Sequence, residues 1–126
     1  MDTFYRENIL DHYREPRYHG RLDRPTISRE ESNPLCGDVI RMDLLIEDGR
    51  LVDARFDGQG CAVSQAAASM LLEEVVGKGV DEVKAFGRDD LFALIGVPLS
   101  PARMKCALLS LGVLRDAIYG AVGRGP

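Results

Sequence analysis

The first hydrophobic pattern in the chain predicts an amphipathic helix over residues 3–15. Apolar and aromatic side chains recur there every four residues, at Tyr5, Ile9 and Tyr13. Such a repeat places them along one stripe of a helix, and core positions are the simplest interpretation of the two tyrosines. Pro16 ends the helix, because the residue before a proline disfavours the helical backbone conformation. The polar, proline-bearing segment 17–35 is interpreted as irregular.

Apolar residues then cluster in a pattern typical of a β-hairpin. The segment 39–46 is rich in valine, isoleucine, leucine and methionine and predicts a strand. Asp48 and Gly49 form a dipeptide that strongly favours a tight hairpin turn. Residues 51–56 alternate loosely between apolar and polar side chains and predict the returning strand. A third short strand is predicted at 61–63.

Strong helix formers dominate the second half of the chain and predict four helices. Their expected ranges are 66–76, 80–86, 90–95 and 101–122. The side chains expected to cap these helices at their N-termini are Ser64, Asp81, Asp89 and Ser100. Strands followed by helices predict an α+β fold, in which helices, including a long C-terminal one, pack against a small three-stranded antiparallel sheet. A chain of 126 residues fits one domain, spanning positions 1–126.

Composition and charge narrow the classes of function. Hydrophobic residues make up 45% of the chain and charged residues 29%, which is typical of a soluble globular domain. The net charge of -4 argues against a general nucleic-acid binder, whose surface is usually basic. No apolar run approaches the roughly 18 residues that a membrane span needs, and the N-terminal residues lack an apolar signal core. The cysteine count of 3 is odd, so we expect a cytoplasmic protein with free thiols and with neither nucleic acid nor membrane as partner.

The three cysteines, Cys36, Cys61 and Cys106, are the candidate chemistry of the chain. They cannot all pair in disulfides within one chain, whereas three thiolates and one further donor can fill a tetrahedral metal site. Asp38 follows Cys36 by two residues, so in an extended segment both side chains point the same way, and Gly37 permits a backbone angle that brings them together. The spacing contains no C-x-x-C pair, however. Buried cysteines without any metal are therefore an equally acceptable interpretation, above all for Cys106 in an apolar helix.

Two cations beside the third cysteine suit a site rich in thiolates. Arg103 and Lys105 precede Cys106 closely. Three thiolates and a carboxylate carry more negative charge than a divalent metal neutralises, so nearby cations would offset the excess. The two histidines, by contrast, have no second donor at metal-ligand spacing. His12 is interpreted as a helix-face residue and His19 as a solvated loop residue.

Three motifs around the cysteines resemble those of a known family. They are Asn-Pro-Leu-Cys-Gly-Asp at 33–38, Gly-Gln-Gly-Cys-Ala-Val-Ser at 58–64 and Arg-Met-Lys-Cys at 103–106. With Ile-Leu-Asp-His-Tyr at 9–13, they resemble the family of IscU, SufU and the NifU N-terminal domain, which comprises iron–sulfur cluster assembly scaffolds and sulfur acceptors. The resemblance covers nearly the whole chain and implies the same fold, a small three-stranded sheet packed with helices.

The resemblance also implies a site and its ligands. Family members hold zinc or a nascent cluster on three cysteines and an aspartate, which correspond here to Cys36, Asp38, Cys61 and Cys106. Thiolates suit both zinc and iron–sulfur clusters. The implied cofactors are therefore Zn²⁺ and, in a scaffold, a transient [2Fe–2S] cluster. The implied partners are a cysteine desulfurase of the SufS or IscS kind, and downstream cluster-assembly or apo iron–sulfur proteins.

The residue before the third cysteine favours one branch of the family. IscU-type scaffolds carry a histidine there, whereas SufU-type sulfur acceptors tend to carry a basic residue, with an arginine two positions earlier. Lys105 and Arg103 match the SufU pattern, although the extra segment of SufU-type proteins between the second and third cysteines is missing. We expect a zinc-dependent acceptor of persulfide sulfur, a sulfurtransferase-like relay with Cys36 as the acceptor thiol. The alternatives are an IscU-type [2Fe–2S] scaffold, which is not an enzyme, and a domain whose zinc is structural.

Overall fold

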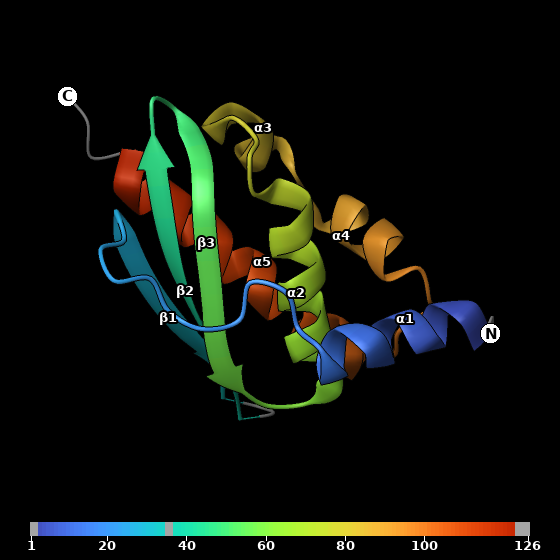
Figure 1. Cartoon of the computed structure of the whole chain (residues 1–126). Coiled ribbons are helices and arrows are strands. Elements are labelled where there is room, and N and C mark those ends of the chain that lie inside the picture. Colours follow the sequence, from blue (N-terminus) through green and yellow to red (C-terminus); the bar gives the residue numbers. More distant parts are fainter. Residues whose placement is uncertain (1–2, 35–36, 123–126) are drawn as a thin grey trace.

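The computed structural model describes residues 3–34 and 37–122 and confirms the α+β fold (Figure 1). Its elements are, in chain order, α1 (Thr3–Arg14), β1 (Ile27–Asn33), β2 (Asp38–Glu47), β3 (Arg50–Gln59), α2 (Ala62–Val75), α3 (Val80–Ala85), α4 (Arg88–Ile95) and α5 (Pro101–Val122). Within that part of the chain, no helix is both long and apolar enough to cross a membrane.

The three strands form one antiparallel sheet in the order β1-β2-β3. The predicted hairpin between β2 and β3 is confirmed. Its turn residues Asp48 and Gly49 have φ angles of 53° and 73°, the left-handed conformation that a two-residue hairpin turn requires. The sheet register places Asp38, the first residue of β2, opposite Asn33 at the end of β1. One end of the sheet therefore carries the hairpin, and the other carries the aspartate of the candidate site.

The prediction of an irregular segment over 17–35 is wrong at β1, which pairs with β2 along its whole length. β1 is an edge strand that contacts α5, and its middle carries charged side chains. Arg29 Nε lies 3.0 Å from Glu31 Oε2, and Arg29 Nη2 lies 3.9 Å from Asp116 Oδ2 on α5. Because these ionic contacts cover this part of the sheet, β1 lacks the apolar alternation that marks a strand in the sequence.

The strand predicted at 61–63 is also wrong. Cys61 is the N-cap residue of α2, and the helix begins at Ala62. Ser64, predicted as the cap, lies inside α2, where its hydroxyl donates to the backbone oxygen of Cys61 at 3.0 Å. The helix therefore starts earlier than its cap signal suggested, and it places Cys61 at its N-terminus.

The caps predicted for the two short helices are wrong as well, whereas the cap of α5 is confirmed. Glycines occupy the N-cap positions of α3 and α4, and their backbone amides donate to the side chains of Glu82 at 3.3 Å and Asp90 at 2.8 Å. Asp81 and Asp89 therefore lie in the first turns of the helices instead of capping them. At α5, the amide of Arg103 donates to Ser100 Oγ at 3.4 Å.

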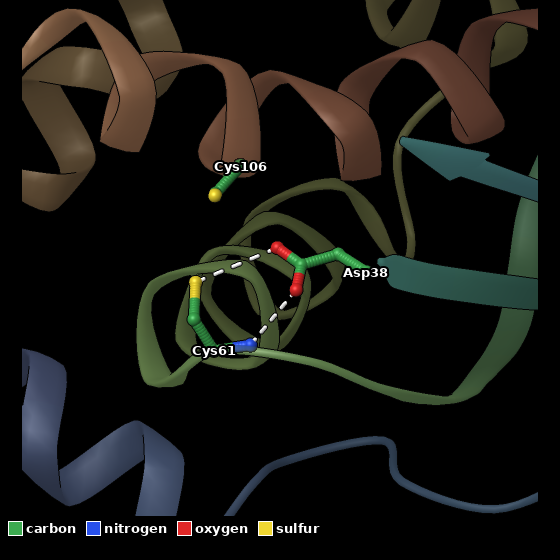
Figure 2. Close-up of side chains that lie close together, drawn as sticks. All are labelled: Asp38, Cys61 and Cys106. Carbon is green, nitrogen blue, oxygen red and sulfur yellow. Dashed lines mark hydrogen bonds between the residues drawn. The ribbon is translucent and has the colours of Figure 1, made fainter. Parts of the chain in front are cut away.

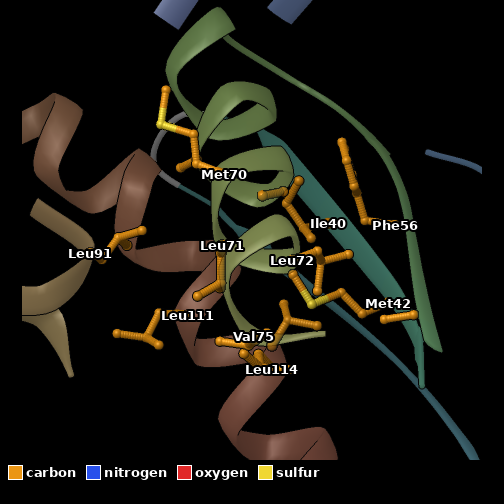
Figure 3. Close-up of a cluster of buried hydrophobic side chains, with 14 of the residues drawn as sticks. Ile40, Met42, Phe56, Met70, Leu71, Leu72, Val75, Leu91, Leu111 and Leu114 are labelled. Carbon is orange, nitrogen blue, oxygen red and sulfur yellow. The ribbon is translucent and has the colours of Figure 1, made fainter. Parts of the chain in front are cut away.

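Helices α2 and α5 cover one face of the sheet, and α1 packs on α2 (Figure 1). Side chains of β2 and β3 meet those of both helices in one core (Figure 3). Fully or almost fully buried members are Ile40, Met42, Phe56, Leu71, Leu72, Val75, Leu111 and Leu114. Tyr13 of α1 is 46% exposed, so its predicted core position is wrong, while Ile9 packs against the core. The side chain of Tyr5 lies outside the described residues.

Candidate metal centre

Three elements that are far apart in the sequence bring the candidate ligands together at one end of the sheet. Asp38 opens β2, Cys61 caps α2, and Cys106 lies in the second turn of α5. One donor atom from each lies within 4.8 Å of the other two. Figure 2 shows the sulfur of Cys106 pointing from α5 toward the sulfur of Cys61 and the carboxylate of Asp38. Cys36, the fourth ligand expected, lies outside the described residues, two positions before Asp38.

The carboxylate of Asp38 is bound to the Cys61 residue through both of its oxygens. The backbone N–H of Cys61 donates to Oδ1 at 3.0 Å, and the thiol of Cys61 donates to Oδ2 at 3.5 Å. Asp38 is only 2% exposed, and a buried carboxylate needs such partners, because leaving it unpaired carries a large desolvation cost. The β2 strand and the N-terminus of α2 are thus joined at the site itself.

The two described cysteines, Cys61 and Cys106, differ in their exposure to solvent. Cys106 is 4% exposed, whereas Cys61 is intermediate between buried and exposed. Cys61 also lies at a helix N-terminus, where the aligned peptide dipoles favour negative charge. Of the two described cysteines, Cys61 is therefore the more accessible to solvent.

The donor atoms suit a metal ion that prefers sulfur with some oxygen. Two thiols and one carboxylate converge, and thiolate, imidazole and carboxylate are the ligands that zinc takes in four-coordinate sites. The same thiolates suit iron–sulfur clusters. The described residues thus fit either group, and they supply three of the four donors that a closed site needs.

The two predicted charge-tuning residues, Arg103 and Lys105, line two different surface pockets. Arg103 lines a surface pocket together with Ala62 and Val63, which directly follow Cys61. Lys105 lines another pocket together with Asn33 and Pro34, which directly precede the Leu35–Cys36 segment. Both side chains are exposed, so water screens them partly, but each lies beside one of the two ligand-bearing loops.

Neither histidine belongs to this cluster. Nδ1 of His12 is hydrogen-bonded to Ser69 Oγ of α2 at 2.8 Å, and Nε2 lies 3.8 Å from Glu73 Oε1. Burial, and to a lesser degree the nearby Arg17 guanidinium, lowers the pKa of His12. His19 is half-exposed, lies 3.8 Å from Asp57 Oδ1 and packs edge-on against Phe56. His12 is therefore a helix-face residue, as expected, and it joins α1 to α2. His19 lies in a solvated segment, also as expected.

The backbone amide of Cys61 is a functional group that the sequence prediction missed. A strand expected at 61–63 would direct this amide to a neighbouring strand, whereas an N-cap leaves it available for Asp38. The signal that could have revealed it is the run Gly-Gln-Gly before Cys61, followed at once by helix formers. Loops rich in glycine that lead into a helix N-terminus commonly present backbone amides to an anion.

The carboxylate and the two thiols gathered at the end of this three-stranded α+β domain are donors suited to a metal ion or a cluster. A family model identifies the class of protein. Residues 4–124 match the NifU-like N terminal domain, so the chain belongs to this family, that of the iron–sulfur cluster assembly proteins IscU and SufU.

Curated relatives bear both of those names. The chain is 35% identical to the zinc-dependent sulfurtransferase SufU of Bacillus subtilis (strain 168), over 94% of this chain and 91% of SufU. It is 37% identical to the iron–sulfur cluster assembly scaffold protein IscU of Thermotoga maritima, over 90% of this chain and 92% of IscU. Sequence identity thus places the chain in the family without choosing between the two branches.

Solved structures agree with the fold. The structure of a putative iron–sulfur cluster assembly scaffold protein for the SUF system from Fervidobacterium islandicum AW-1 superposes with a TM-score of 0.79 at 26% identity, covering 89% of this chain and 94% of that one. A NifU-like protein (N-terminal) from Brucella abortus superposes with a TM-score of 0.80 over 96% of both chains. Its identity of 22% supports the fold alone.

Proposed function

We propose that this protein is a zinc-dependent acceptor of persulfide sulfur from a cysteine desulfurase, acting in cytoplasmic iron–sulfur cluster assembly as one domain over residues 1–126. The observation that carries the proposal is the surroundings of Cys106. Lys105 stands immediately before it, and both histidines are engaged outside the cluster of Asp38, Cys61 and Cys106. The similarity to a protein named a zinc-dependent sulfurtransferase supports the same function.

The proposed zinc ligands are Cys36, Asp38, Cys61 and Cys106. A bound zinc ion would favour the thiolate form of its cysteine ligands at neutral pH. Three thiolates and one carboxylate exceed the charge of the ion, and Arg103 and Lys105 lower the cost of that excess. The thiolates are then available as nucleophiles as well as ligands.

The proposed chemistry is one thiol–persulfide exchange at Cys36. Its thiolate attacks the outer sulfur of the desulfurase persulfide, and a new sulfur–sulfur bond forms on Cys36. The sulfur–sulfur bond of the donor breaks, and the desulfurase cysteine leaves as a thiolate. Atoms, charge and electrons balance without a further oxidant or reductant. The acceptor must be accessible, and the sequence predicts access for Cys36, which stands between Pro34 and Gly37 among residues typical of turns.

A second candidate is a scaffold that assembles a [2Fe–2S] cluster on the same four ligands and passes it to an apo iron–sulfur protein. The similarity to the Thermotoga maritima scaffold, at 37% identity, supports this candidate as the similarity to SufU, at 35%, supports the first. Overall similarity does not separate the candidates, because the match to SufU covers 94% of this chain and the match to this IscU covers 90%.

The test combines metal content with two activities. The purified protein is assayed for zinc and iron and is then mixed with a cysteine desulfurase and cysteine. Stimulation of desulfurase turnover by the zinc form supports the sulfur acceptor. A brown protein that passes its cluster to an apo-ferredoxin without stimulating the desulfurase would instead establish the scaffold. If Cys36→Ser kept both activities, the zinc would be structural.

A further inference from the structure

We infer that Gly60 and the backbone N–H of Cys61 are positioning elements of the metal centre, which hold one oxygen of Asp38 and direct the other toward the thiols. The inference rests on the metal site of the proposed function. It concerns how a ligand is oriented and not which reaction follows. It assigns a role to two groups that are not ligands themselves.

The two oxygens of Asp38 have different surroundings. Oδ1 accepts the hydrogen bond from the Cys61 amide at 3.0 Å, while Oδ2 lies 3.5 Å from Cys61 Sγ (Figure 2). Cys61 is an N-cap residue, so its amide has no partner inside α2 and is free to bind the carboxylate. A hydrogen bond to one oxygen fixes the rotation of the whole carboxylate, as partners of metal ligands commonly do.

Gly60 makes this contact possible because it has no side chain. A Cβ atom at this position would overlap Oδ1 of Asp38, and would lie 2.5 Å from its Cγ and 2.9 Å from its Cβ. The φ angle of Gly60 is +145°, which residues with side chains rarely adopt. The loop can therefore approach the carboxylate closely only with glycine before Cys61.

The consequence is a carboxylate that offers one donor atom in a fixed direction. A four-coordinate site takes a single atom from each ligand, so a carboxylate free to rotate or to bind through both oxygens would fit it less well. The amide of Cys61 ties Asp38 to the same residue that supplies a thiolate. Two of the four ligands are thus oriented together before any ion binds.

The first test compares two glycine variants with similar backbone conformations. Gly60→Ala is matched by Gly20→Ala, because Gly20 has a φ angle of +127° and a Cβ added there would meet no atom within 4 Å. We expect Gly60→Ala to weaken zinc binding about 10–100-fold in a chelator competition, and to change the visible absorption bands of the Co²⁺-substituted protein. Gly20→Ala should retain both. Wild-type affinity and spectrum in folded Gly60→Ala would overturn the inference.

The second test needs neither a variant nor a metal. Amide hydrogen exchange of Cys61 is measured in the metal-free wild-type protein. We expect protection of this amide, because Asp38 Oδ1 is its acceptor. Exchange at the rate of an unstructured chain would overturn the inference even if Gly60→Ala did not fold. If the protein bound no zinc, the proposed function would be refuted. The exchange rate of the Cys61 amide would still show whether that amide holds the carboxylate of Asp38.

Discussion

The two ends of the β2–β3 pair are joined to the helices by different interactions. At the hairpin end these are backbone hydrogen bonds: the amide of Val80 donates to the carbonyl oxygen of Gly49 at 2.8 Å, and the amide of Leu51 donates to the carbonyl oxygen of Lys78 at 2.9 Å. At the ligand end, a buried carboxylate and two thiols gather around one amide. Side chains that bind one another there can bind a metal ion instead. We therefore expect the hairpin end to serve stability and the ligand end to serve the proposed chemistry.

The largest expected effect lies at the hairpin end. Leu51 is the second residue of β3 and is fully buried, so Leu51→Ala should lower the free energy of unfolding of the zinc-free protein by about 2–5 kcal/mol. Urea denaturation measures this loss. The neighbouring Val52 is 38% exposed, and Val52→Ala should cost no more than about 1 kcal/mol. At urea concentrations below the unfolding transition, zinc affinity should stay at the wild-type value in both variants. A loss of zinc affinity in Leu51→Ala would contradict the separate roles of the two ends.

The converse effect is expected at the ligand end. Cys61→Ser removes a proposed ligand, so zinc affinity in a chelator competition should fall by at least about 100-fold, the upper range for residues that only support ligands. The free energy of unfolding of the zinc-free protein should change by less than about 1 kcal/mol, because Cys61 is partly exposed and serine has a similar shape. Unchanged affinity would remove Cys61 from the ligand set.

A smaller effect concerns pH and the contact between α1 and α2. The pKa of His12 is lowered in the folded protein, mainly by burial, so the unfolded state binds a proton first as the pH falls below about 6.5. The free energy of unfolding should therefore decrease below that pH and be regained above it. Denaturation of the metal-free protein between pH 7 and 5 measures this slope. His12→Gln should flatten it, whereas a slope altered only by His19→Gln would contradict the assignment.

The smallest effect is expected at Lys105. Lys105→Ala removes an exposed cation near the cluster, and exposed charge pairs contribute no more than about 1 kcal/mol, or about fivefold in affinity. Zinc affinity should fall within that range, and the difference should shrink as salt is added. Arg115→Ala is the matched control, because Arg115 is also exposed but lies nine residues beyond Cys106 on α5. If both variants lost the same zinc affinity, the effect would come from the net charge of the protein and not from the position of Lys105.

The same contrast explains how much of the fold could be predicted from the sequence. The turn at Asp48 and Gly49 and the start of α5 at Ser100 depend on neighbouring residues, and both predictions are confirmed. β1 could not be found in this way, because Arg29 and Glu31 fill positions where an ordinary strand would show apolar residues. Their contacts with α5 join segments more than 80 residues apart, and no local pattern contains them.

The candidate site shows the same limit. Its candidate ligands Asp38, Cys61 and Cys106 are implied by the family resemblance of the motifs around them, whereas spacing alone makes a metal site and ordinary buried thiols equally acceptable. The convergence of these residues depends on the register of β2 against β1 and on where α2 begins. Because Cys61 was placed in a strand, its amide could not be recognised as a partner of Asp38.

The most direct test of the proposed function is the location of the transferred sulfur. The zinc-loaded protein is incubated with a cysteine desulfurase and cysteine, its thiols are alkylated, and its peptides are examined by mass spectrometry. The proposed function predicts one added sulfur on Cys36, formed in the wild-type protein and absent in Cys36→Ser. A persulfide confined to Cys61 or Cys106, or none at all while a cluster forms on the protein, would contradict it.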